Sequence, residues 1–344
     1  MQRALPLRAP GGNSDHDRAD PMPVRFLLCR MMACAMLMLA GLLAATGHVA
    51  AQSCTLSVTP MIFNPIDVTA NAQVDATATA TVNCSGLPLQ LVGVCIDLGP
   101  GSGGATDATS RFMVNGAQQL RYGLYATGMV PWGSSTWAGG AANPVGFNMV
   151  LTAGGTGSRA EIITGRVYGG QPTAAPLAYA STFTGLEARI RYGLLSFLLG
   201  CNLLTSSQTT TFTVTANVPP TCRVTTNLLD FGSAGILGSN RDVASNLTPT
   251  CTNGTAYQVG LDGGLTGATN PAQRRMSKGA EFVTYGLYRD GGRTLPFGST
   301  AGVDTLAGTG TGLAQAVTIH GRVPSQATPS PGLYTDTIVA TVVY

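Results

Sequence analysis

The chain has 344 residues, enough for two domains, and only 10% of them are charged while 44% are hydrophobic. This composition is too apolar for a disordered protein and too poor in Lys and Glu for a helical one. From residue 52 onward there are 14 basic and 13 acidic residues. The balance excludes the basic surface of a nucleic-acid-binding protein and an equally strong acidic surface.

The N-terminus has the pattern of a secretion signal. Arg25 and Arg30 precede an apolar run over 31–45, and Val49-Ala-Ala51 supplies the small residues of a cleavage site. The run is short for a membrane span. We therefore expect residues 1–51 to be a prefix and signal peptide cleaved after Ala51, with Met1 or Met22 as the start, and we expect export through the periplasm.

Cleavage would leave six of the eight cysteines: Cys54, Cys84, Cys95, Cys201, Cys222 and Cys251. An even number of cysteines in an exported chain indicates disulfides. The mature chain would keep a single histidine, His320, which argues against multi-histidine metal sites and Ser–His catalysis. We expect no catalytic, metal or cofactor-binding residue.

An internal repeat defines two domains. Phe63 lies nine positions after Cys54, as Phe231 lies nine positions after Cys222, and a second cysteine follows in each copy. Later matches follow in the same order: Arg111-Phe-Met113 with Arg275-Met276, Leu120–Tyr125 with Val283–Tyr288, Trp132-Gly133 with Phe297-Gly298, and Gly165-Arg-Val167 with Gly321-Arg-Val323. The predicted domains are 52–218 and 219–344, with the boundary at Val218-Pro-Pro-Thr221.

Both copies consist of short alternating or apolar runs between clusters of Gly, Pro, Asn and Asp, a pattern typical of a β-sandwich. The clearest runs are Gln73–Val82, Leu89–Leu98, Gln119–Tyr125, Tyr257–Leu261, Phe282–Tyr288 and Ala316–Val323. The stretch Leu186–Leu199 is the exception that could be helical. The fold class is all-β, with two tandem sandwiches.

The repeat also predicts the disulfide pairing. Cys54–Cys84 and Cys222–Cys251 occupy the same places in the two copies, so each pair should close within its own domain. Cys95 and Cys201 occur only in the first copy and are left to pair with each other. Each repeated bridge closes a loop of about 30 residues, worth about 3–4 kcal/mol in the chain-entropy model.

These motifs, together with the closing Gly332-Leu-Tyr-Thr-Asp-Thr-Ile-Val-Ala-Thr-Val-Val-Tyr344, resemble the spore coat U domain family. The family includes spore coat proteins and subunits of archaic (Csu-type) chaperone–usher pili. The resemblance is close over 222–344 and looser over 54–185, where no Gly follows Phe63. It implies incomplete immunoglobulin-like, pilin-type domains that fold on a periplasmic chaperone, pass an outer-membrane usher and receive a donor strand from the next subunit.

The two copies end differently. The run Tyr334–Tyr344 is apolar on both faces and therefore predicts a central strand, which needs a neighbour on each side. The first copy continues into Thr209–Val218, which we expect to complete its own sheet. The second copy has no such run, so we expect it to borrow a strand; the alternative is a complete sandwich with a short edge. The expected acceptor-strand residues are Tyr334, Ile338, Val339, Ala340, Val342 and Tyr344.

Only Gln52 and Ser53 would precede Cys54, too few residues to form a donor strand. A subunit that accepts a strand and donates none is expected at a pilus tip on the cell surface, with domain one as the adhesive head. The Trp-bearing stretch 129–147 predicts an apolar loop that binds hydrophobic or abiotic surfaces. Its candidate residues are Val130, Trp132, Trp137, Val145 and Phe147, with Met149 just beyond it. The alignment of Trp132 with Phe297 favours a structural position shared by the two copies over an adhesive one.

Other signals are weaker. Leu194–Leu199 could be a second apolar loop or a buried strand leading to Cys201. Gly99-Pro-Gly-Ser-Gly-Gly104 satisfies G-x-G-x-x-G, but no helix follows, so we interpret it as a turn. The basic cluster Arg274-Arg275-Lys278 is interpreted as a solvated loop. A spore or cell coat protein is the alternative to a tip adhesin, and a polysaccharide-active enzyme is a third hypothesis, disfavoured because the acidic residues form no local pair.

Overall fold

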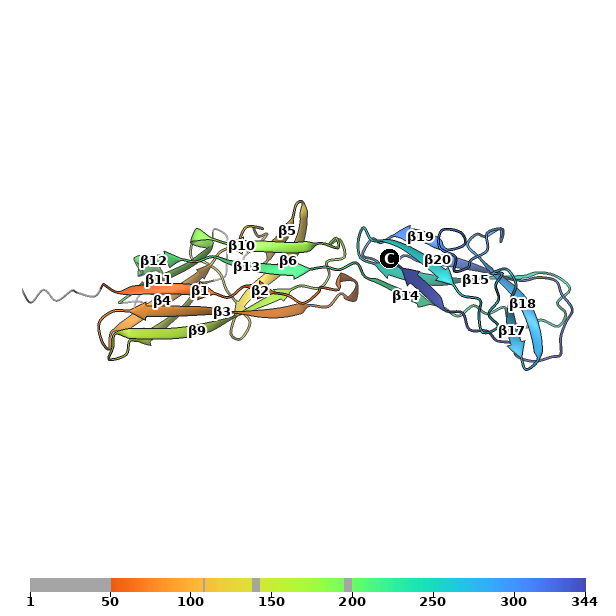
Figure 1. Cartoon of the computed structure of the whole chain (residues 1–344), viewed down its shortest axis with the longest axis horizontal. Helices are drawn as coiled ribbons and strands as arrows, with labels where there is room; N and C mark the ends of the chain where they lie inside the picture. The colour runs from red at the N-terminus through yellow and green to blue at the C-terminus, as the bar shows by residue number, and fades with distance from the viewer. Residues whose placement is uncertain (1–50, 108, 138–142, 195–199) are drawn as a thin grey trace, which may run out of the picture. The chain divides into compact units, whose positions relative to one another are not determined.

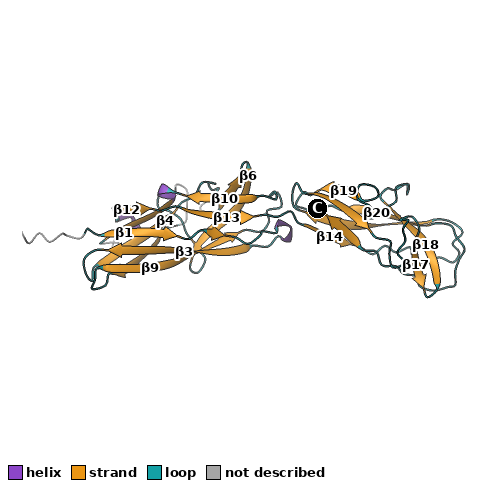
Figure 2. Ribbon diagram, in the orientation of Figure 1, coloured by secondary structure: helices purple, strands orange, loops and turns teal. Residues whose placement is uncertain are grey.

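The computed structural model describes residues 51–107, 109–137, 143–194 and 200–344. These residues are almost entirely strand and loop (Figure 2), with three short 3-10 helices, η1 (Val68–Ala70), η2 (Gly185–Glu187) and η3 (Cys201–Leu203). None of the helices in these ranges has the length and hydrophobicity needed to cross a membrane. The expected signal peptide, apart from Ala51, lies outside the described residues.

Strands β1–β13 form domain one, a sandwich of two sheets (Figure 1). The larger sheet has the order β1-β3-β9-β6-β5-β10-β13-β2, and β7 pairs with β6 beside this path. Its strands are β1 (Ser53–Val58), β2 (Met61–Ile62), β3 (Val74–Ser85), β5 (Arg111–Asn115), β6 (Gln118–Ala126), β7 (Val130–Pro131), β9 (Thr156–Val167), β10 (Ala178–Phe183) and β13 (Phe212–Asn217).

The smaller sheet of domain one has the order β12-β11-β4-β8. Its strands are β4 (Leu91–Leu98), β8 (Val145–Val150), β11 (Ala188–Gly193) and β12 (Ser206–Thr209). Alternate residues of the facing strands meet in one core, as Val94 and Ile96 of β4 do with Phe212 and Val214 of β13. The period-two alternation of the sequence therefore corresponds to an inner and an outer face.

Strands β14–β21 form domain two, again as two sheets. One has the order β14-β15-β20-β18-β17 and the other the order β19-β16-β21. The bounds are β14 (Cys222–Thr226), β15 (Arg241–Cys251), β16 (Ala256–Leu261), β17 (Arg274–Lys278), β18 (Glu281–Tyr288), β19 (Leu306–Thr309), β20 (Val317–Val323) and β21 (Ala340–Val343). The all-β prediction of two tandem sandwiches is confirmed.

The three expected disulfides are present, Cys54–Cys84, Cys95–Cys201 and Cys222–Cys251. Both repeated bridges join residues that face each other across the first two paired strands of their domain. Each bridge therefore fixes the register of the first strand against its neighbour.

A buried arginine occupies the same place in both domains. Arg111 is fully buried, and it donates from Nε to Gly99 O (2.7 Å) and from Nη2 to Leu98 O (2.8 Å) and Trp132 O (2.6 Å). Arg274 donates in the same way to the carbonyls of Asp262, Leu261 and Phe297. Each arginine thus joins the large sheet to the end of a central strand of the small sheet.

This geometry corrects two sequence predictions. The counterpart of Arg111 is Arg274, not Arg275, because Arg274 makes the equivalent bonds. Arg274 is also not part of a solvated loop: its side chain is buried, whereas Arg275 is exposed on the opposite face of β17. The misreading arose because a buried cation without a carboxylate partner is rare; here the carbonyl oxygens supply the charge-assisted hydrogen bonds.

Replacing Arg111 should destabilise domain one, because three carbonyl oxygens would remain buried without a donor. Burial lowers the pKa of Arg111 to about 10, so the side chain is still charged at neutral pH. We expect Arg111→Met to lower the free energy of unfolding by about 3 kcal/mol or more. Both tryptophans of the protein lie in domain one, so urea unfolding followed by tryptophan fluorescence measures this domain selectively.

The control is Arg121→Met, which removes an exposed guanidinium that lies 5.1 Å from the centre of the Tyr168 ring. It should change the free energy of unfolding by about 0.5 kcal/mol or less. Equal losses in the two variants would contradict a structural role for the buried arginine.

Candidate functional site

The last strands of domain one have no counterpart in domain two. β13 pairs antiparallel with β10 over Ala178–Phe183 and parallel with β2, and β12 pairs with β11. Phe212, Val214 and Ala216 of β13 point into the core, as expected. The prediction that Thr209–Val218 completes the sheet of domain one is confirmed.

In domain two the segment equivalent to β10 and β11 has a neighbour on one side only. Thr335 bridges to Ser277 as Ala180 bridges to Val114, and β21 pairs with β16 as β11 pairs with β4. Residues 219–344, all of which the structure describes, provide no strand on the other side. We call this gap the acceptor slot; it is bordered by Tyr334–Val343 on one side and by 227–236, the counterpart of β2, on the other.

Burial at equivalent positions shows what the missing strands would cover. Tyr179, Phe183 and Ile190 of domain one are at most 1% exposed. Their counterparts Tyr334, Ile338 and Val342 are only partly buried against the core of domain two. The slot is therefore lined by core side chains that no segment of domain two covers.

The opposite wall of the slot repeats the pattern. Phe63 is buried in domain one, whereas its counterpart Phe231 is only partly buried. A Cβ at Gly165 would lie 2.9 Å from Phe63 Cζ, and one at Gly321 would lie 3.0 Å from Phe231 Cζ. The glycine of each Gly-Arg-Val motif thus makes room for a ring that packs at the slot.

The expected acceptor-strand residues divide into two groups. Tyr334, Ile338, Ala340 and Val342 face the core, while Val339 and Tyr344 are each 56% exposed. The regular strand is shorter than predicted, because only Ala340–Val343 is β21. Before it, Asp336 accepts hydrogen bonds from the Tyr285 hydroxyl (2.6 Å) and the Leu265 amide (2.8 Å), and Asp262 Oδ1 accepts from the Val339 amide. These side-chain bonds replace a regular ladder with the neighbouring strand.

The six candidate adhesive residues do not form one exposed loop. Trp132 is fully buried and donates from its indole to Ile96 O (3.0 Å), which corrects its place among the surface candidates. Val145, Phe147 and Met149 alternate along β8 and pack against the core, because a strand turns every second side chain inward. Trp137 is partly buried beside Arg111, whose guanidinium lies 4.8 Å from the ring centre, and Val130 is exposed on β7.

The exposed apolar side chains of domain one gather instead at the end where β4 begins. Leu91 faces Val150 in the β4–β8 pair, and β11 ends beside β4 at Gly193. Three connections therefore meet at this end: β3–β4, β8–β9 and β11–β12. Six side chains, which we call the end patch, are each 40–69% exposed: Leu87, Leu89, Leu91, Val150, Leu194 and Leu203. The chain leaves domain one from the opposite end, after β13.

Two of the three connections support each other. Gly86 N donates to Gly155 O (2.9 Å), Leu89 N donates to Thr152 O (3.2 Å), and Leu151 N donates to Gln90 O (2.9 Å). Leu89 has a positive φ of 57°, which is unfavourable for leucine and is held by these bonds. The structure therefore fixes leucines outward rather than burying them.

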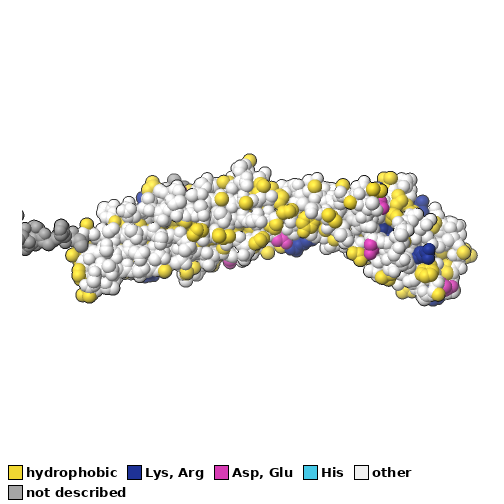
Figure 3. Space-filling model, viewed as in Figure 1, with side chains coloured by type: hydrophobic (Ala, Val, Ile, Leu, Met, Phe, Trp, Pro, Cys, Tyr) yellow, Lys and Arg dark blue, Asp and Glu magenta, His cyan; other side chains and the backbone are white. Residues whose placement is uncertain are grey.

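No charged residue occurs in 85–92, 150–157 or 200–209. Figure 3 shows that charged side chains are sparse over the visible face of domain one. The sequence signal that could have revealed the patch is Leu87-Pro-Leu89, an apolar sequence at a turn where polar residues are usual. Leu194–Leu199, apart from the exposed Leu194, lies outside the described residues.

A fully buried carboxylate holds the loops next to the small sheet. Asp97 accepts from Arg191 Nε (2.7 Å) and Ser135 N (2.8 Å), and Arg191 also donates to Cys201 O. Burial by itself raises the pKa of Asp97, but hydrogen bonds from Arg191 and Ser135 outweigh burial and lower the pKa below its ordinary 3.8. Asp97 thus fixes the Trp137-bearing loop and, through Arg191, the Cys95–Cys201 connection.

Within the described ranges, no three residues of the types that bind metals come together in a cluster. The arrangement offers an open strand edge and an apolar end, which suit binding to a chain and to a surface. These features are those of an all-β binding or structural protein.

Comparison with known proteins identifies the family. The Spore Coat Protein U domain matches residues 39–185 and 208–341, so the chain belongs to the Spore Coat Protein U domain family, with two copies of the domain. Protein U of Myxococcus xanthus is 33% identical over 81 residues, which cover 24% of this chain and 45% of that protein. The chain thus spans about half the length of this curated relative.

A solved structure shares the fold. The CsuC–CsuE chaperone–tip adhesion subunit pre-assembly complex of Acinetobacter baumannii archaic chaperone–usher Csu pili contains a chain with a TM-score of 0.50 and 15% identity, covering 85% of this chain and 100% of that chain. The CupB6 tip adhesin of Pseudomonas aeruginosa has a TM-score of 0.37 and 10% identity, covering 86% and 94%. At 15% identity the first likeness concerns the fold alone.

The Asp97 cluster predicts an acid-sensitive domain one. Because the pKa of Asp97 is depressed in the folded state, its stabilising contribution is complete above the ordinary pKa and is lost as the pH falls through the folded value. Asp97→Asn should lower stability at pH 7 by about 3–5 kcal/mol, because Arg191 loses its buried partner. It should also flatten the decline of stability below about pH 4. Tryptophan fluorescence during urea unfolding at several pH values measures both effects.

Asp75→Asn is the matched control, since Asp75 forms an exposed ion pair with Arg166 at 2.7 Å. This pair should contribute about 1 kcal/mol or less. An acid profile that is unchanged by Asp97→Asn would show that Asp97 does not control the acid sensitivity.

Proposed function

We propose that this protein is the adhesive tip subunit of a chaperone–usher pilus. Domain two joins the fibre by accepting a donor strand in the acceptor slot, and domain one binds surfaces through the end patch. The role is structural and adhesive, without catalysis. The subunit passes through the periplasm to the cell surface, and adhesion at the pilus tip promotes biofilm formation.

One observation carries the proposal. Domain one contains β12 and β13, which pair with β11 and β10, while domain two has the same framework without these strands. The N–H and C=O groups along one edge of a core-lining strand need partners, and a strand from another chain supplies them by β-augmentation. Tyr334, Ile338 and Val342 are the side chains that such a strand would cover.

The partners follow from this requirement. A periplasmic chaperone would occupy the slot before assembly, an outer-membrane usher would exchange it, and the next pilin would donate the final strand. The shared fold with a chain of a chaperone–tip adhesion subunit complex supports the chaperone step of this proposal. The expected signal peptide, with cleavage after Ala51, supplies the route to the periplasm.

The adhesive surface of the proposal is the end patch rather than the Trp-bearing stretch. Contiguous exposed apolar side chains usually mark an interaction site, and here hydrogen bonds between turns hold them outward. Val130 and Trp137 retain some exposure. Val130, however, lies far from the end patch. It pairs with Ala126, next to Tyr125, which lies opposite Thr164 of β9. Thr164 is eight positions along β9 from Thr156 at the patch end, roughly 26 Å. The proposed target is a hydrophobic or abiotic surface.

A structural protein of a spore or cell coat is the alternative. The family description and the likeness to Protein U favour it. In a coat protein, domain two would be a stable sandwich with a free edge, and no chaperone would be required. The two functions therefore predict different stabilities for domain two when the full chain has no partner bound.

Because the slot is open, we expect domain two of the mature chain to be sensitive to proteases when no partner is bound. We expect limited proteolysis to leave a resistant fragment of domain one, residues 52–218, while 219–344 is degraded. Co-expression with the pilus chaperone of the same organism should give a one-to-one complex in which domain two resists cleavage at least about tenfold longer, because the open form is no longer populated. Mass spectrometry of the fragments measures the outcome.

A control separates chaperone binding from general stabilisation. Ile338→Asp places a charge in the slot and should abolish complex formation, whereas Val303→Asp, at a residue 68% exposed in a loop, should not. A partner-free chain whose domain two resists protease as well as domain one does would refute the strand-acceptor function and favour a coat protein.

The end patch predicts adhesion that depends on its leucines. The double variant Leu87→Ser and Leu89→Asn should reduce attachment to hydrophobic plastic about tenfold or more, given about 1 kcal/mol for each half-buried leucine. Asparagine is chosen at position 89 because it tolerates positive φ. Attachment is measured with purified chaperone-bound protein and with piliated cells.

Val130→Ser is the matched control, since Val130 is 59% exposed but lies away from the patch. It should leave attachment unchanged, and both variants should assemble pili normally. If Leu87→Ser with Leu89→Asn attaches as strongly as the unmodified protein, the end patch is not the adhesive surface.

A further inference from the structure

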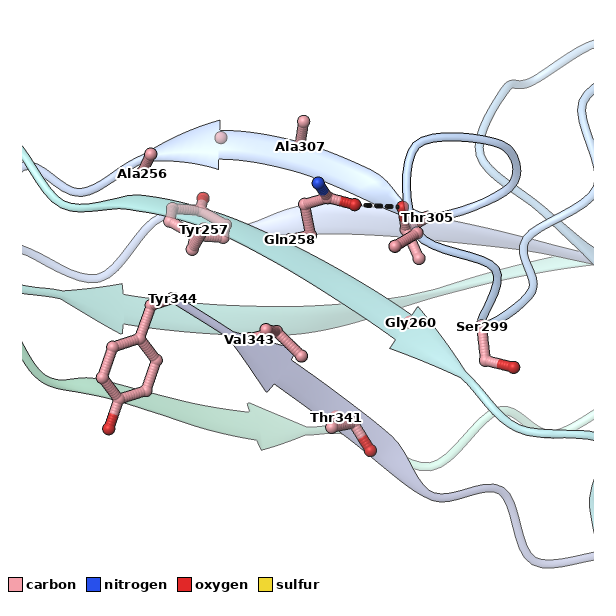
Figure 4. Close-up of a pocket in the computed structure, with 12 residues that line it drawn as sticks. Ala256, Tyr257, Gln258, Gly260, Ser299, Thr305, Ala307, Thr341, Val343 and Tyr344 are labelled. Atoms are coloured by element: carbon pink, nitrogen blue, oxygen red, sulfur yellow. Dashed lines mark hydrogen bonds between the residues drawn. The ribbon is translucent and has the colours of Figure 1, made fainter.

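The outer face of the small sheet in domain two carries a groove beside the acceptor slot. The groove has a volume of about 520 Å³ and lies over β16, between β19 and the end of β21. Figure 4 shows Gln258 and Ala307 along it, with Thr341, Val343 and Tyr344 on the β21 side. No charged side chain lines the groove.

Domain one shows what covers the same face. Strand pairing places Cys95 opposite Gly146 and Arg191, just as Gln258 lies opposite Ala307 and Val343. In domain one this face is covered by the residues just before β12. Cys201 is bonded to Cys95, and a Cβ on Gly146 would lie 3.2 Å from Cys201 Sγ. Leu204 is buried, and a Cβ on Gly193 would lie 3.1 Å from its Cδ2.

The groove and the slot are therefore two parts of one uncovered site. In domain one the chain crosses the outer face at 201–204 and then enters the sheet as β12 and β13, antiparallel to β11 and β10. A strand that enters the slot in the same direction begins beside Tyr344, the counterpart of Tyr192. The residues before it would emerge at the groove.

We infer that the groove binds the segment of the donor chain immediately preceding its donated strand. This inference rests on the proposed strand acceptance. The segment is uncharged. It has a small side chain about five residues before the strand, as Cys201 lies before Ser206 at the start of β12, and an aliphatic side chain about two residues before the strand, at the position of Leu204. Gln258 and Val343 stand where domain one has Cys95 and Arg191, so the contact is noncovalent and lacks an ion pair.

Domain one supplies the probe for a test. Because Tyr344 corresponds to Tyr192, a copy of residues 193–218 appended after Tyr344 would supply domain two with its own cover and strands. We would combine this extension of the full chain with Gln258→Cys, which places a thiol at the counterpart of Cys95. If the preceding segment enters the groove, the appended copy of Cys201 and the new thiol should form a disulfide in more than about nine tenths of the molecules.

Two controls locate the contact. Leu313→Cys, at a residue 60% exposed away from the groove, should leave both thiols free. Adding Ala307→Arg to the Gln258→Cys chain should reduce disulfide formation about tenfold, whereas Thr309→Arg on the same face of β19 should not. Peptide mapping under non-reducing conditions measures each bridge, and limited proteolysis reports whether domain two is complete.

The outcomes distinguish the groove from the slot. Protease resistance together with the Gln258→Cys bridge supports the inference. Protease resistance with free thiols, or an equal yield of the disulfide from Leu313→Cys, would contradict binding of the segment in the groove. Strand acceptance would still be supported. If domain two of the extended chain remains sensitive to protease, both strand acceptance and binding in the groove are contradicted.

Discussion

The structure depends on the pairing of one long segment in each domain, β10–β11 in domain one and Tyr334–Val343 in domain two. Each segment lines the core with alternate side chains, so its backbone N–H and C=O groups need partners on both edges. Domain one meets this requirement with β12 and β13. Domain two has the same segment with one edge unpaired, and this difference underlies both the acceptor slot and the partner that we propose for it.

The framework that holds the open domain together does not use the missing strands. Arg274 joins β17 to the carbonyls after β16, and Cys222–Cys251 fixes β14 on β15. The same two devices stand in domain one as Arg111 and Cys54–Cys84. Both devices of domain two lie within residues 219–344, so their contacts do not require a strand in the slot.

The sequence allowed the repeat, the disulfide pairing and the closing role of Thr209–Val218 to be predicted, because these follow from order, spacing and alternation. It did not distinguish Arg274 from Arg275, since adjacent residues of a strand point to opposite faces and only the pairing shows which is inside. Trp132 and Phe147 stood among the surface candidates, although the match of Trp132 with Phe297 already favoured a structural place, and the structure turns both to the core. The end patch joins three connections that are distant in sequence, so the local signals at Leu87-Pro-Leu89 and Leu194 did not show that these side chains lie at one end of the domain.

The absence of charged residues from the end patch and the groove has a consequence for the medium in which the protein works. Contacts made by apolar and neutral polar groups are not screened by ions, so their strength does not fall as ionic strength rises. Strongly hydrated salts would instead strengthen them. Such surfaces gain no long-range electrostatic steering, so the association rate would be low and would not depend on the salt concentration. Attachment and fibre assembly would then tolerate large changes in salinity.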